Sequence, residues 1–465
     1  MRAGYGGQVL ITERRTGRHG GGVVADLAAV AAAVALVVVA ALLGWRLLGA
    51  GQDLDLPWPP LLAHWLPHVG PGTPAAVLVA ALVATHGPGL AARLRWRPLL
   101  ALAYPASVLW TFSLALVDGW QRGVADRLTT RDEYLHDVPL VPDIPLLLRT
   151  FTDHILTAAV DPAQTWFWTT HVGAHPPLPF LLFLWLDRLG LGGGGPAGVF
   201  VILVGSSACV AVAVALRALG VEGVARRALP FGVLLPGAVW VGVSADGLFA
   251  AVLAWSVALV AVGAAGAGFR PAMAATAGGA LFGCCLYLSY GLALGVLLPL
   301  AVLVQARAGR AAVLAGCGLG AVVLAFTASG FWWFTGYADV KVIYAASIAA
   351  TRPYLYFGLA DIAAVLFATG PALVAGLRRA VAGLGSVSMP VRLAPGPAVL
   401  LAGAAVAAIV LADLSGMSKG EVERIWLPFV VWLVPLAALL DHRRAWLLGQ
   451  AALALAVNHL LLTVW

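Results

Sequence analysis

Apolar runs long enough to cross a lipid bilayer follow one another along almost the whole chain of 465 residues. A helix needs roughly 20 apolar residues to span the hydrocarbon layer. Hydrophobic residues make up 61% of the sequence and charged residues only 11%, whereas a soluble domain has about a quarter charged residues. The runs are too long for the alternating strands of a membrane barrel. The sequence therefore predicts an all-α polytopic membrane protein.

About thirteen crossings fit these runs at roughly 20 residues each. They occupy segments 24–48, 74–92, 98–117, 198–216, 228–242, 247–266, 272–288, 290–305, 311–333, 357–377, 395–413, 425–440 and 445–464. The apolar run after Pro177 ends at Asp187 and is short for a crossing, so we interpret it as a half-inserted or interfacial helix. The alternative is a full crossing, which would place Arg217, Arg226 and Arg227 outside.

Arginine clusters between the runs indicate the orientation, because cytoplasmic loops carry the excess of Lys and Arg. One side of the predicted bundle gathers Arg2, Arg14, Arg15, Arg18, Arg93, Arg95, Arg97, Arg217, Arg226, Arg227, Arg270, Arg307, Arg310, Arg378, Arg379, Arg392, Arg443 and Arg444. This predicts a protein of the cytoplasmic (plasma) membrane whose N-terminus lies on the inner, cytoplasmic side. It also explains the formal charge of +7 without nucleic acid as a partner. Segment 118–173 and the loops 334–356 and 414–424 then fall on the outer face.

The longest polar stretch, segment 118–173, is expected to form short amphipathic helices along the outer interface. Asp118 closes the third crossing, where partial desolvation would raise the basicity of a carboxylate; a solvated helix end is the alternative. Glu133 and Tyr134 follow in the loop, and a solvated loop carboxylate is the other interpretation of Glu133.

His171 and His175 stand just ahead of Pro176-Pro177. Proline suits the first turn of a helix, which needs no amide donors, so this element can open a helix whose N-terminal dipole attracts anions. The two imidazoles could bind phosphate, relay a proton or ligate a metal, or they could belong to a structural turn.

Three further outer positions place polar side chains beside apolar spans. Asp246 lies at the start of a span, where a carboxylate is costly and marks a candidate site; capping of that helix is the alternative. Arg352 beside Tyr354 could hold a phosphate or stack on a sugar ring, or both residues could belong to an aromatic belt.

The last polar cluster precedes the twelfth crossing and contains Lys419, Glu421, Glu423 and Arg424. Lys341 and Lys419 are the only lysines in the chain, and both fall on the outer side, against the usual bias. This favours phosphate binding by Lys419 and Arg424, with a surface ion-pair network as the alternative.

Together these elements resemble the GT-C superfamily of membrane glycosyltransferases, which use sugars carried on polyprenyl phosphates. The shared features are Asp118 ahead of a long outer loop, His175-Pro176-Pro177, the acidic element Ser244-Ala245-Asp246-Gly247, and an actinobacterial-type stretch, Glu421-Val422-Glu423-Arg424-Ile425-Trp426. The resemblance covers roughly residues 98–440.

The resemblance implies an enzyme in which Asp118 is the general base that deprotonates the acceptor hydroxyl, while Asp246 and Glu133 position acceptor or donor. The residues that would stabilise the departing phosphate are His171, His175, Arg352, Lys419 and Arg424. Those that would contact acceptor or sugar are Tyr134, Tyr354, Glu421 and Glu423. The implied partners are a polyprenyl-phosphate-linked sugar donor, membrane lipids, and an envelope glycan, glycolipid or protein acceptor.

The resemblance also divides the chain into a basic tail with two extra crossings, residues 1–97, and a GT-C-like module, residues 98–465. No DxD motif follows Asp118 in the outer loop, so a divalent metal is not indicated and the cofactor stays open. A transporter or flippase of a lipid-linked envelope precursor is the alternative function. Transporters place charges near the midplane and show inverted repeats, and the sequence shows neither pattern. An inactive assembly partner of an envelope complex is a third hypothesis.

Overall fold

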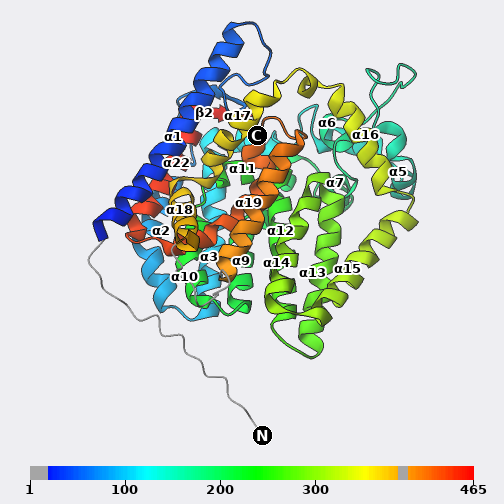
Figure 1. The fold of residues 1–465 in the computed structure, drawn as a ribbon. Coiled ribbons are helices and arrows are strands. Elements are labelled where there is room, and N and C mark those ends of the chain that lie inside the picture. The colour runs from blue at the N-terminus through cyan, green and yellow to red at the C-terminus, as the bar shows by residue number, and fades with distance from the viewer. Residues whose placement is uncertain (1–18, 386–395, 465) are drawn as a thin grey trace.

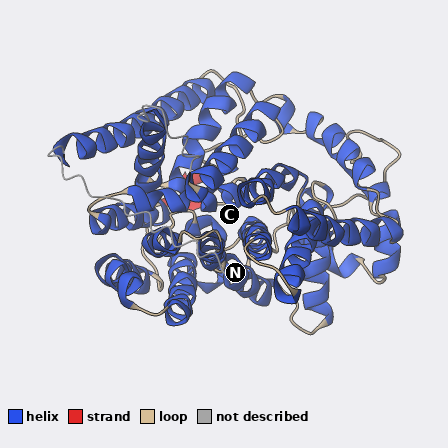
Figure 2. Cartoon of the chain, turned by 60° about the horizontal axis from the view of Figure 1, so that its bottom comes forward, coloured by secondary structure: helices blue, strands red, loops and turns tan. Residues whose placement is uncertain are grey.

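The regular secondary structure of the protein is almost entirely helical, as its computed structural model shows (Figure 2). The structure describes residues 19–385 and 396–464. The basic residues Arg2, Arg14, Arg15, Arg18 and Arg392 lie outside the described residues. Long helices run side by side across the molecule (Figure 1), and their apolar composition confirms the prediction of an all-α membrane protein.

Eight helices of the described part are long and apolar enough to cross a membrane. They are α1 (His19–Gly49), α2 (Thr73–Arg93), α3 (Trp96–Ala115), the continuous pair α8 (Gly194–Ser206) and α9 (Ala208–Ala218), α12 (Ala245–Ala264), α13 (Phe269–Leu288), α15 (Gly309–Ala328) and α19 (Pro397–Ser415). Each coincides with one of the predicted crossings.

The other five predicted crossings fall on helices that are shorter, broken or less apolar. They are α10 (Glu222–Val233) with α11 (Ala238–Val241), η5 (Tyr290–Val296) with α14 (Leu297–Ala306), α17 (Tyr354–Thr369) with α18 (Pro371–Gly385), α20 (Val422–Ile425) and α21 (Leu427–Val430) with η7 (Val431–Leu439), and α22 (Arg443–Leu460). The pair α17 and α18 is bent by 108°. Gly370 at the joint has a positive φ of 78°, and Pro371 cannot donate the next backbone hydrogen bond.

Short helices build the polar segment 118–173 and the short run after Pro177, as the sequence predicts, and they also occupy most of the loop expected at 334–356. They are η1 (Leu116–Asp118), a π-helical turn η2 (Gln121–Ala125), α4 (Tyr134–Asp137), η3 (Val138–Leu140), α5 (Ile144–Thr150), η4 (Thr152–His154), α6 (Thr170–Gly173), α7 (Leu178–Arg188), α16 (Trp333–Ala345) and η6 (Ile348–Ala350). With 11 residues, α7 extends about 17 Å at 1.5 Å per residue, too short for a bilayer core of about 30 Å. Arg188 at its end donates to the carbonyl of Val141 at 2.6 Å, so α7 returns to the polar segment.

One end of the bundle carries the arginine clusters, and we call it the arginine end. The carboxylate of Asp26 in α1 pairs with Arg378 at 2.6 Å and Arg379 at 2.7 Å, and Arg379 also pairs with Asp441 before α22. Arg226 of α10 donates to the carbonyls of Ala91 and Leu94 at the end of α2.

The opposite end carries the polar segments, and we call it the site end. Here β1 (Ala63–Trp65) pairs antiparallel with β2 (Leu461–Thr463), with Ala63 opposite Thr463. Arg127 donates to the Thr463 carbonyl at 2.7 Å, which joins segment 118–173 to this small sheet. The first two spans are part of the same bundle, since α1 packs on α17 and α18 and α2 packs on α3 and α22. The division at residue 98 stays a prediction.

Candidate functional site

Arg424 lies at the centre of a buried polar cluster at the site end. Its Nη1 atom lies 2.6 Å from Oδ2 of Asp246, and its Nη2 atom contacts the carboxylate of Glu421 and lies 3.2 Å from Nε2 of His171. The Arg424 side chain is only 8% exposed. We use the name Arg424 cluster for the group Glu133, Tyr134, His171, His175, Asp246, Glu421, Glu423 and Arg424.

Local backbone geometry brings the parts of this cluster together. Gly420 and Glu421 both have positive φ, 89° and 62°, and this left-handed turn reverses the chain just before α20. Asp361 of α17 holds the turn by accepting from the Gly420 amide at 2.9 Å. Asp246 lies in the first turn of α12, where a carboxylate complements the helix dipole.

The hydrogen bonds of His171 define its tautomer. Its Nδ1 lies 2.7 Å from the carbonyl of Asp132, which can only accept, so Nδ1 carries the proton. Its Nε2 faces the Arg424 guanidinium, which can only donate, so Nε2 accepts. Burial, together with the charge of Arg424, lowers the pKa of the His171 ring to about 3. His171 is therefore a neutral acceptor for Arg424.

His175 and Tyr134 extend the cluster as a group of packed rings. The ring of His175 lies parallel to that of His171 with centroids 6.2 Å apart, and its Nδ1 donates to the His171 carbonyl at 2.9 Å. Tyr134 packs within about 6 Å of both imidazoles, and Phe249 of α12 lies 5.8 Å from His175. Burial lowers the pKa of His175, so this ring is also neutral.

Two further carboxyl groups lie in the cluster without a cation of their own. Glu133 is 3% exposed and Glu423 is 1% exposed, and the Oε2 atom of each has no hydrogen-bond partner among the described residues. Burial raises the pKa of each carboxyl from 4.5 to about 8, although the charge of Arg424 opposes the shift. Both are therefore mainly protonated near pH 7 and can give up a proton when a cation or base approaches.

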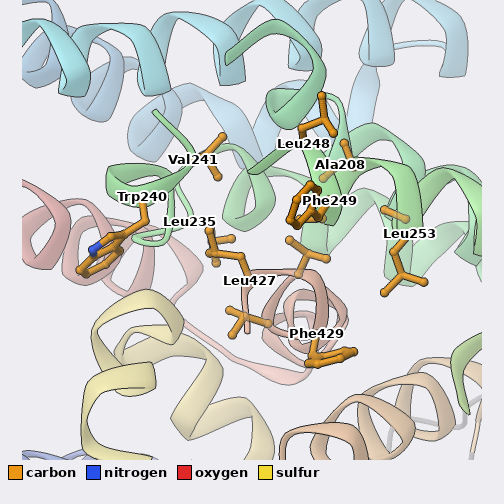
Figure 3. Close-up of a cluster of buried hydrophobic side chains, with 14 of the residues drawn as sticks. Ala208, Leu235, Trp240, Val241, Leu248, Phe249, Leu253, Leu427 and Phe429 are labelled. Atoms are coloured by element: carbon orange, nitrogen blue, oxygen red, sulfur yellow. The ribbon is translucent and has the colours of Figure 1, made fainter. Parts of the chain in front are cut away.

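A narrow crevice with a mainly apolar lining lies beside Asp246. Its volume is about 40 Å³, and its lining includes Phe249, Ser289, Ser418 and Trp426. The helices below it are packed tightly: Leu427 and Phe429 of α21 belong to the same buried cluster as Phe249 and Leu253 of α12 (Figure 3). This packing holds α20, and with it Arg424, against the first turn of α12.

Asp118 is bound in a second cluster. Its Oδ1 lies 2.9 Å from Nε2 of His68 and 3.0 Å from Nη2 of Arg122, and its Oδ2 lies 3.0 Å from Nη2 of Arg127. The resemblance assigns positions 118, 133, 175, 246 and 424 to one reaction. The structure gives two clusters, because the π-helical turn after Asp118 folds Arg122 and Arg127 back onto its carboxylate. Sequence reasoning missed His68, which nothing nearby in the sequence marks.

Arg352 and Lys419 brace two loops beside the Arg424 cluster. Arg352 donates to the carbonyls of Lys419 and Leu54 and pairs with Asp55, while Lys419 donates to the carbonyls of Arg352 and Ala349. The side chains of both predicted phosphate ligands thus donate hydrogen bonds to backbone carbonyl oxygens. Tyr354 is exposed and donates to the Leu414 carbonyl at 3.2 Å. Tyr354 therefore lies at the surface, two residues after Arg352.

Within residues 19–385 and 396–464, no group of three or more His, Cys, Asp or Glu side chains is arranged to hold a metal ion.

Comparisons with known proteins identify no relative. Searches against protein-family models, curated proteins and solved structures found no match to this chain.

Proposed function

We propose that this chain is a membrane glycosyltransferase of the GT-C type that transfers a sugar from a polyprenyl-phosphate donor to an acceptor at the outer face of the cytoplasmic membrane. The observation that carries the proposal is the Arg424 cluster: one buried guanidinium among carboxylates and neutral imidazoles, next to a crevice in the apolar bundle. Envelope glycans, glycolipids and proteins are the acceptor classes that fit an outer-face site.

The reaction needs a cation for the leaving phosphate and a base for the acceptor. The acceptor oxygen attacks the anomeric carbon, the bond from that carbon to the phosphate oxygen breaks, and the phosphate leaves with the electron pair. Arg424 is the proposed cation, since electrostatic stabilisation is strongest where water is excluded. Binding of the phosphate would replace one of its carboxylate contacts.

Asp246 is a better placed base than Asp118. The sequence resemblance assigns this role to Asp118, but His68, Arg122 and Arg127 already contact the oxygens of that carboxylate. Asp246 lines the crevice, and its Oδ2 contacts Arg424. Once Arg424 turns to the phosphate, this carboxylate would be free to take the acceptor proton. Asp118 would then hold the outer segment in place.

The proposed topology keeps the thirteen crossings. The five broken or short segments each connect the arginine end with the site end, so they would count as traverses together with the eight long helices. The arginine end would face the cytoplasm, as the positive-inside rule predicts, and the Arg424 cluster would face outward.

The proposal is tested with the purified protein in lipid, a panel of polyprenyl-phosphate sugars, and an assay for released polyprenyl phosphate. Asp246→Asn should lower turnover by about 100-fold or more, as expected for loss of a general base, and Asp153→Asn, at an exposed carboxylate of the short helix η4, should not. Asp118→Asn tests the assignment from the resemblance. Failure to release polyprenyl phosphate from any donor, with the protein folded, would overturn the proposal.

A further inference from the structure

A second polar cavity lies at the arginine end, remote from the Arg424 cluster. Its volume is about 520 Å³, and its lining is formed by Pro88 and Ala92 of α2 and by residues 442–445 at the start of α22. Three of these six residues, His442, Arg443 and Arg444, are basic, and none is acidic. The proposed glycosyl transfer does not use this cavity.

The negative groups nearest in the chain are already neutralised. Asp441, next to His442, pairs with Arg379 at 2.9 Å. The last carbonyls of α2, which would repel an anion, are bound by Arg226, with 2.9 Å to Ala91 and 2.8 Å to Leu94. The positive charge of Arg443 and Arg444 therefore faces the cavity without a competing acid from these neighbours.

The surroundings of the cavity suit the headgroup of a lipid. The cavity lies between two helices of the bundle at the end where the arginine-bearing loops meet the apolar spans. Leu448 of α22, one helical turn after Arg444, is 52% exposed. A phosphate in the cavity would thus have apolar surface beside it for acyl chains, which a soluble phosphate would not use.

We propose that this cavity binds the phosphate headgroup of an anionic phospholipid. Basic pockets between membrane helices are suited to such headgroups, and each arginine near the surface contributes about 1 kcal/mol, which corresponds to about fivefold in affinity. The lipid would bridge α2 and α22 at their arginine-end termini.

The test measures retention of labelled phosphatidylglycerol by the full-length protein in phosphatidylcholine nanodiscs. The double variant Arg443→Gln/Arg444→Gln should bind the anionic lipid about 25-fold more weakly, from two fivefold contributions. The matched control is Arg95→Gln/Arg97→Gln, which removes two exposed charges at the same end outside the cavity lining and should change retention by less than about twofold.

A second variant leaves both arginines in place. Ala92→Glu puts an acid on the α2 wall of the cavity and should also weaken retention, without removing any contact of α22. Equal losses in the cavity and control variants would overturn the proposal, because diffuse charge would then explain binding. Displacement of the labelled lipid by glycerol phosphate at equal concentration would also overturn it, since the ligand would then be a soluble phosphate.

Discussion

At the scale of single residues, the Arg424 cluster is defined by which groups are charged. Arg424 keeps its charge: burial disfavours the cation, but Glu421 and Asp246 outweigh that effect and raise its pKa. His171 and His175 are neutral, and Glu133 and Glu423 are mainly protonated near pH 7. The cluster therefore holds one cation, its two carboxylate partners and a surrounding layer of neutral groups.

The buried carboxyl of Glu133 predicts how stability depends on pH. Its pKa is raised from 4.5 to about 8, so the folded state favours the protonated form. The stabilisation is full below about pH 4.5 and is lost as pH rises through about 8, by linkage. Glu133→Gln removes this titration, so the loss of stability between these limits should shrink by on the order of a few kcal/mol. Thermal unfolding in detergent across this range measures it.

Glu423→Gln is the matched variant, because its carboxyl has a similar environment and a pKa of about 8. The two single variants should each flatten the profile, and the double variant should flatten it further. Unchanged pH profiles in all three variants would show that neither carboxyl is protonated in the folded protein.

At the scale of elements, α1 is attached to the bundle at two points. Only 11% of the residues in its most apolar stretch are buried, so most of the helix surface lies on the outside of the bundle. Asp26, which is fully buried, joins it to Arg378 and Arg379 at the arginine end. At the other end, Gly44 packs so closely that a Cβ atom would collide with Tyr356 and Pro59.

Gly44→Ala should therefore destabilise the protein. The added methyl group meets the Tyr356 hydroxyl and the Pro59 ring, and overpacking of this kind costs about 1–3 kcal/mol. Gly22→Ala in the same helix is the control, because a Cβ there meets nothing within 4 Å and alanine favours a helix by up to about 1 kcal/mol. Thermal unfolding of the two variants compares them. A Gly44→Ala variant as stable as Gly22→Ala would contradict the close packing of α1.

Hydropathy predicted the helical elements better than their ends and breaks. The eight long spans follow from apolar composition alone, since a bilayer requires about 20 such residues. The bend at Gly370–Pro371 lies inside one apolar run, and a hydropathy pattern carries no information about backbone angles. The short helix α7 was predicted because its apolar run ends early, at Asp187.

At the scale of the whole molecule, the sequence predicted all eight residues of the Arg424 cluster as site candidates but not their pairing. Motif order and common sidedness brought Glu133, His171, Asp246 and Arg424 into one hypothesis, and all four lie in one cluster. Asp118 separated from them because its partners depend on the fold of η2 and on His68, 50 positions earlier in the chain. Charge type can be read from a sequence, whereas the choice among several cations for one carboxylate depends on tertiary contacts.

The two-ended arrangement of the bundle predicts which cysteines a membrane-impermeant thiol reagent can reach. Asp246 begins α12, and Gly263 at the other end of that helix lines a cavity with Gly309. The two ends of this 20-residue helix are about 30 Å apart at 1.5 Å per residue, so Gly309 and the Arg424 cluster should lie on opposite sides of the membrane.

After replacement of the four native cysteines, Asp161→Cys and Ser418→Cys should react in intact cells. Gly309→Cys should react only after permeabilisation. Labelling of all three cysteines from one side would contradict the two-ended bundle. If instead Gly309→Cys alone reacted in intact cells, the two-ended bundle would stand, but the Arg424 cluster would face the cytoplasm. The proposed outer-face transfer could not occur there.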